Sequence, residues 1–162
     1  MIGLFALAAA SAANCPAENA HYRLRHAPGV EAYFRKVDSG SDWPSGVALA
    51  IHFGGSGHTY WWLPGIPGSD HHQTLFSTTE VTAPGWRPPS PDGGPRPYGS
   101  TEYLGLDASY DILGDMPHRG STAPAHMLLA YAGDPEFNHG AGNSIPNFKQ
   151  FFDLVSCSAK GG

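Results

Sequence analysis

The segment 47–63, VALAIHFGGSGHTYWWL, decides which fold this chain adopts. Before its glycines, apolar side chains recur at every second position, which is the period of a β-strand. These positions are Val47, Leu49, Ile51 and Phe53. The positions between them include Ala48 and Ala50, so we expect burial on both faces. Residues 54–57, Gly-Gly-Ser-Gly, then lead into the β-forming run 58–63, and the whole segment predicts a hairpin.

The composition predicts a folded domain that is mainly β. Of the 162 residues, 41% are hydrophobic and only 14% are charged, which excludes a disordered chain. The 21 glycines and 15 prolines interrupt regular structure often, so we expect many short strands joined by turns. We predict a single domain over residues 14–162, either a β-sandwich or a curved antiparallel sheet, with one or two short helices. An α+β domain is the alternative.

Alternating and continuous apolar runs place the other elements. We expect strands at 21–25, 30–37, 73–81 and 127–131. Thr101–Leu113 fits a strand slightly better than a helix, whereas 147–157 fits either. Ala83–Gly99 contains six prolines and predicts a long surface loop.

The first 13 residues have the pattern of an export signal. They carry no charge, and an apolar run from Ile2 to Ala10 precedes small residues suited to cleavage. The run is shorter than the roughly 20 apolar residues of a membrane span, and we predict no transmembrane segment. We therefore expect a secreted or periplasmic protein. A buried N-terminal strand is the alternative for this segment.

Cys15 and Cys157 are the only cysteines of the chain. In an exported protein an even number of cysteines favours pairing, so we predict one Cys15–Cys157 disulfide. This bond would hold the C-terminal element against the N-terminal strand. Two free buried thiols are the alternative.

The charge of the chain excludes some classes of partner. A formal charge of −5 gives no basic surface for nucleic acid or an anionic membrane. Protonation of all nine histidines would change the formal charge from −5 to +4, so an acid-responsive, His-rich module is one hypothesis.

One group of side chains could bind a metal ion, with zinc as the candidate. It consists of His52, His58, Asp70, His71 and His72. If Phe53 pairs with His58 across the hairpin, His52 and His58 point to opposite faces, which opposes a shared site. The chain has no His-Glu-x-x-His motif, and we expect no cofactor.

Ser56 does not fit a hydrolase nucleophile. The strained turn that carries such a serine needs glycine two residues before and two residues after it. Gly54 meets this requirement, but His58 stands at the second position. We therefore expect Ser56 to be part of a hairpin tip.

Aromatic side chains are the best candidates for ligand contact. Tyr60, Trp61 and Trp86 could pack on the apolar face of a ligand. Trp61 and Trp62 are consecutive in a predicted strand and must point to opposite faces, so only one of them can join such a surface. Trp86 lies within the predicted proline-rich loop.

No motif in the chain identifies a catalytic mechanism. We therefore expect an exported, non-enzymatic binding or structural module that uses the proline-rich loop and its aromatic residues. Its ligand would be a small molecule, a carbohydrate or a protein. A metal-dependent hydrolase and an acid-responsive module are the alternatives.

Overall fold

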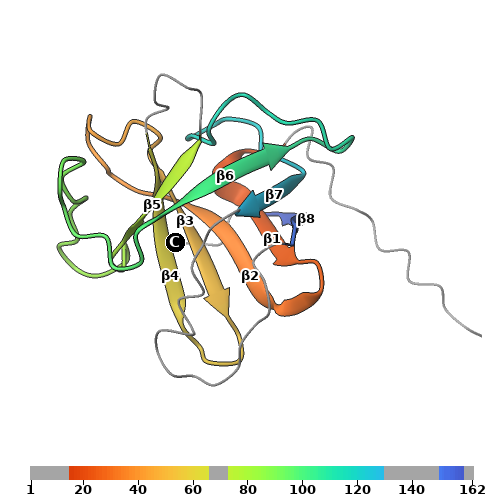
Figure 1. The fold of residues 1–162 in the computed structure, drawn as a ribbon, viewed down its shortest axis with the longest axis horizontal. Helices are drawn as coiled ribbons and strands as arrows, with labels where there is room; N and C mark the ends of the chain where they lie inside the picture. Colours follow the sequence, from red (N-terminus) through yellow and green to blue (C-terminus); the bar gives the residue numbers. More distant parts are fainter. Residues whose placement is uncertain (1–14, 66–72, 130–149, 159–162) are drawn as a thin grey trace, which may run out of the picture.

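The protein folds into a closed antiparallel barrel of eight strands in sequence order (Figure 1). The computed structural model describes residues 15–65, 73–129 and 150–158. The strands are β1 (Ala20–Leu24), β2 (Ala27–Lys36), β3 (Val47–Phe53), β4 (Thr59–Pro64), β5 (Thr74–Thr78), β6 (Ser100–Leu106), β7 (His126–Leu129) and β8 (Phe152–Cys157). A single turn of 3₁₀ helix, η2 (Ala17–Asn19), precedes β1. The prediction of a mainly-β fold is confirmed.

The barrel differs from the predicted sandwich or open curved sheet. β1 pairs with β2 along one edge and with β8 along the other, so the first and last strands close the sheet on itself. A closed sheet leaves no unpaired strand edge, which a sandwich retains. Strand alternation is the same in both folds, and therefore the residue pattern alone does not distinguish them.

The β3–β4 hairpin has the predicted form. Leu49 pairs with Trp62 and His52 with Thr59, and the Phe53 amide donates to the His58 carbonyl at 2.9 Å. Gly57 has φ 77°, a backbone conformation that glycine adopts without strain. The glycine-rich segment therefore makes the turn that the strands require.

The strand predicted over Thr101–Leu113 is correct only in its first half. β6 ends at Leu106, and the prediction is wrong from 107 to 113. There the Asp107 carboxylate accepts hydrogen bonds from the amides of Ser109, at 2.7 Å, and Asp111, at 3.0 Å. This local turn competes with the strand ladder. At the C-terminus, β8 confirms the strand reading from Phe152 onward, whereas 147–149 lies outside the described residues.

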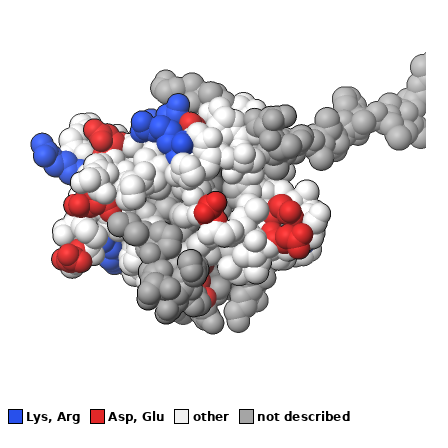
Figure 2. Space-filling model, turned by 90° about the horizontal axis from the view of Figure 1, so that it is seen from above, with Lys and Arg blue, Asp and Glu red and all other residues white. Residues whose placement is uncertain are grey.

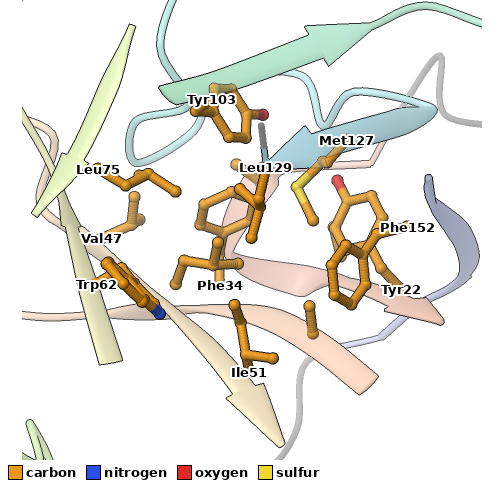
Figure 3. Packing of buried hydrophobic residues seen from close by; sticks show 14 of the residues in the cluster. Tyr22, Phe34, Val47, Ile51, Trp62, Leu75, Tyr103, Met127, Leu129 and Phe152 are labelled. Carbon is orange, nitrogen blue, oxygen red and sulfur yellow. The ribbon is translucent and has the colours of Figure 1, made fainter. Parts of the chain in front are cut away.

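Large side chains fill the interior of the barrel (Figure 3). The largest fully buried ones include Trp62, Tyr22, Tyr103, Phe53 and Phe152. They come from five different strands, because each strand turns alternate residues inward. An eight-stranded barrel is just narrow enough for side chains to fill.

A second apolar cluster lies on the outside of the barrel. It consists of Val37, Trp43, Ala48, Ala50, Trp61 and Leu63. The connection from β5 to β6 covers it, since Trp86 packs against the cluster and Trp43 Nε1 donates to the Pro89 carbonyl at 2.9 Å. The Arg96 guanidinium lies 5.1 Å from the centre of the Trp43 ring. This cover explains why β3 is buried on both faces, as predicted.

The antiparallel order divides the connections between two ends of the barrel. The hairpin end carries residues 25–26, 54–58 and 79–99, which join β1 to β2, β3 to β4 and β5 to β6. The disulfide end carries residues 37–46 and 107–125 together with η2 and the Cys15–Cys157 bond. Residues 79–99 contain neither helix nor strand.

The predicted disulfide between Cys15 and Cys157 is present. Ala20 pairs with Cys157 at the end of the β1–β8 ladder, so the bond lies where the barrel closes. The predicted packing of the C-terminal strand on the N-terminal strand is confirmed. Among the residues that the structure describes, no helix is long and apolar enough to cross a bilayer.

An ion cluster lies at the join between β7 and β8. Within the described residues this ladder has two residue pairs, one of which is His126 with Asp153. Asp153 accepts from His126 Nδ1 at 2.7 Å and from two nitrogens of Arg25, at 2.7 and 2.8 Å. The Tyr110 ring stacks on His126 at 4.2 Å and its hydroxyl accepts from Arg25 at 2.6 Å. These contacts join β1, β7 and β8 at the shortest ladder.

Replacing both cysteines by serine is expected to lower the free energy of unfolding. A loop closed over a sequence separation of 142 residues contributes up to about 5 kcal/mol through the entropy of the unfolded chain. Urea denaturation of the double variant measures the loss. Wild-type protein in reductant serves as the control and should match the variant. An unchanged midpoint in both would contradict this role for the bond.

Asp153→Asn is expected to lower the free energy of unfolding by about 1 kcal/mol at pH 7. The loss is small because the ion pair of Asp153 with Arg25 is partly exposed. Burial raises the pKa of the Asp153 carboxyl, but the hydrogen bonds from Arg25 and His126 outweigh burial and lower it overall. A lowered pKa gives stability that is complete above the unfolded-state value of about 3.9 and is lost as the pH falls through the folded-state value. Urea denaturation between pH 2 and 7 should therefore show a smaller acid loss in the variant. An equal loss in both proteins would refute the assignment.

Candidate functional site

The candidate site is a groove of about 530 Å³ at the hairpin end of the barrel, called here the rim groove. Its lining comprises Gly57–Trp61, Thr78–Glu80 and Pro97–Tyr98. The first segment leads into β4, the second begins at the last residue of β5, and the third lies near the end of the proline-rich connection before β6. Three segments far apart in sequence therefore meet at one rim of the barrel.

The start of β4 contributes to both faces of the sheet. Tyr60 belongs to the interior cluster and Trp61 to the outer cluster, as strand alternation requires. Trp62 returns to the interior, so the prediction that Trp61 and Trp62 face opposite ways is confirmed. The groove thus lies at the edge of the barrel, where residues from both the inner and the outer face of the sheet contribute to it.

Aromatic rings form one wall of the rim groove. The Tyr60 ring packs edge-on against Tyr98, with centroids 5.0 Å apart, and against Phe53 at 5.5 Å. His58 makes a third edge contact with Tyr60 at 6.1 Å. Tyr60 is 4% exposed, whereas Tyr98 is half-buried. Tyr98 therefore offers the accessible ring surface, and Tyr60 holds it in place.

Polar groups line the rest of the groove. His58 Nδ1 lies 3.3 Å from the Tyr60 hydroxyl, and Thr79 and Glu80 are exposed in the same groove. The Thr82 hydroxyl donates to Glu80 Oε1 at 2.5 Å, which orients the carboxylate. The groove thus combines ring surface with an imidazole, hydroxyls and one carboxylate.

Trp86 lies away from the rim groove. Its side chain is half-buried and packs against the outer cluster. Its indole Nε1 is buried and has no hydrogen-bond partner within the described part of the chain. Of the three aromatic residues predicted to contact a ligand, Tyr60 and Trp61 therefore line the groove and Trp86 covers the barrel wall.

Two of the residues predicted to bind a metal ion, His52 and His58, lie within the described residues. His52 Nδ1 lies 3.0 Å from Thr59 Oγ1, its neighbour across the hairpin, whereas His58 contacts Tyr60. The opposite orientation predicted for the two histidines is thus observed. Asp70–His72 lies outside the described residues. Within residues 15–65, 73–129 and 150–158, no three His, Cys, Asp or Glu side chains are grouped to hold a metal ion.

Sequence reasoning missed two features that tertiary structure creates. One is the cluster of Arg25, Tyr110, His126 and Asp153, whose members are spread over most of the chain. The other is a second hollow, at the disulfide end, lined by the β6–β7 connection. No periodicity marks either feature, because their residues come from turns and from different strands.

Comparison with family models, with curated proteins and with solved structures gave no match to this chain.

Proposed function

We propose that this chain is an exported binding module that holds a small neutral carbohydrate in the rim groove. The observation that carries the proposal is the lining of the groove, in which the accessible ring of Tyr98 lies in the same hollow as the Glu80 carboxylate. A sugar needs both kinds of contact, since its ring has an apolar face and a periphery of hydroxyl groups.

The aromatic wall supports the apolar half of this recognition. Edge packing against Tyr60 orders the Tyr98 ring before any ligand arrives, so little side-chain freedom is lost on binding. The Tyr98 amide also donates to Ser77 Oγ at 2.9 Å, which fixes the backbone that carries the ring. A preorganised ring favours a rigid partner such as a pyranose.

The charge of the groove supports a neutral ligand. Among the described residues that line it, Glu80 is the one acidic residue and none is Lys or Arg, so an anion would be repelled. Carboxylates accept hydrogen bonds from hydroxyl groups, and bonds to charged groups are the stronger ones. In the view of Figure 2, charged side chains are separate spots on a mostly uncharged surface, and no continuous charged band is present.

The place of the groove supports a binding role for the proline-rich connection. Pro97 and Tyr98 end this connection, and Trp43 and Arg96 fix its course along the barrel wall. Binding residues are often carried on loops that a rigid scaffold positions.

The disulfide supports export, because such bonds persist in oxidising compartments. The signal segment predicted for residues 1–13 stays a prediction.

The full chain is expected to bind a neutral oligosaccharide from a panel with a Kd of about 1 mM or lower, since few contacts in an open groove give about −4 kcal/mol. Glu80→Gln should weaken binding about tenfold, the value of a hydrogen bond to a charged acceptor. Tyr98→Ala should abolish it. Isothermal titration calorimetry measures both effects.

Two control variants keep the test specific. Glu31→Gln changes an exposed carboxylate on β2, and Tyr110→Ala removes an exposed ring at the other end of β6. Both should bind as the wild type does. If no neutral sugar binds, or if the control variants lose as much affinity as Glu80→Gln and Tyr98→Ala, the rim groove is not a carbohydrate site.

A further inference from the structure

A second hollow opens at the disulfide end of the barrel, and we call it the end cleft. Its volume is about 520 Å³, within the usual range for small-molecule sites. Its lining includes Tyr103, Leu113, Met116, Ala123 and Pro124. Met116 and Ala123 belong to the interior apolar cluster, so the cleft borders the barrel core.

The Tyr103 hydroxyl is the unusual group of this cleft. Tyr103 is fully buried, and its hydroxyl has no hydrogen-bond partner among the described residues. A Cβ at Gly105 would lie 2.9 Å from that oxygen and 3.5 Å from Pro124 Cβ, so the glycine leaves space where the hydroxyl lies. Figure 3 shows the ring beneath β6 with its oxygen on the side of β7.

A neighbouring buried tyrosine, Tyr22, has a hydrogen-bond partner for its hydroxyl. The Tyr22 hydroxyl, also in the core, donates to the Pro124 carbonyl at 3.0 Å. Phenylalanine would fill the Tyr103 position without the cost of a buried, unpaired hydroxyl. Burial raises the pKa of Tyr103, so its hydroxyl keeps its proton and can donate at neutral pH.

A second unpartnered atom lies close by. An adjoining hollow of about 320 Å³ shares Tyr103, Leu113 and Gly114 with the end cleft. Its wall includes Gln73, whose Nε2 donates to the Leu113 carbonyl at 2.9 Å. Gln73 Oε1 is buried without a partner in the described part of the chain. The two adjoining hollows therefore each contain a buried polar atom that could bond to a ligand.

The mouth of the cleft restricts the charge of a ligand. Among the described residues that line the cleft, Asp107 and Asp115 are acidic and His118 is the one basic residue. Two carboxylates at the mouth disfavour an anion such as a fatty acid. The apolar floor of Met116 and Pro124 disfavours a sugar.

We propose that the end cleft binds a neutral, mainly apolar small molecule whose carbonyl oxygen accepts a hydrogen bond from the Tyr103 hydroxyl. The site lies at the opposite end of the barrel from the rim groove and takes a different class of ligand. It is therefore independent of the function proposed above.

The test uses the full, disulfide-bonded chain and the neutral dye N-phenyl-1-naphthylamine, whose fluorescence rises in apolar sites. Two competitors of similar shape displace it: 4-phenyl-2-butanone, which has a carbonyl group, and n-butylbenzene, which has none. Tyr103→Phe should leave the dye affinity unchanged and reduce the preference for the ketone over the hydrocarbon about fivefold, the value of one neutral hydrogen bond. Comparing the preference in the two proteins cancels the different solubilities of the competitors.

Two further variants locate the dye. A Cβ at Gly114 would meet no atom within 4 Å, so Gly114→Leu adds a side chain at the cleft without a clash and should abolish dye binding. Val155→Ala, an exposed apolar position on β8, should leave binding unchanged. The proposal is overturned if wild-type protein does not bind the dye, if Gly114→Leu still binds it, or if Tyr103→Phe keeps the full ketone preference. Because these probes are not sugars, their failure leaves the rim groove unaffected.

Discussion

The pairing of β1 with β8 is the constraint on which the rest of the structure depends. It closes the sheet, gives every strand two neighbours and creates an interior that side chains from all sides fill. The Cys15–Cys157 bond secures this ladder at one end, and Asp153 with Arg25 secures it at the other. Within the described residues the adjacent β7–β8 ladder has two residue pairs, so the ions at its edge compensate for few backbone hydrogen bonds.

Closure also decides where binding can occur. The interior is filled and the outer wall of β3 and β4 lies under the proline-rich connection, so hollows form where connections meet the rims. The hairpin end combines ring surface with a carboxylate, which suits a sugar, whereas the disulfide end combines an apolar floor with a buried hydroxyl donor. Different chemistry at the two ends follows from different connections on one scaffold.

Much of the fold could be predicted from the sequence because strand alternation is a local property. Val47–Phe53, the glycine turn and the opposed faces of Trp61 and Trp62 follow from it, and the cysteine count predicted the disulfide. The cysteines also predicted that the last element packs on the first strand, but a closed barrel could not be told from a sandwich, since strand alternation is the same in both. Sequence also missed the turn at Asp107, where a side chain competes with the ladder, and the gathering of Tyr98, Glu80 and Tyr103 at the rims.

If the rim groove at the hairpin end is a ligand site, titration of the ¹⁵N-labelled full chain with neutral oligosaccharides will move amide signals in its NMR spectrum. We expect shifts confined to the amides of His58–Trp61, Thr78–Glu80 and Tyr98, which line the groove, while those of β8 stay in place. No shift with any sugar, or shifts that are largest away from these three segments, would contradict it.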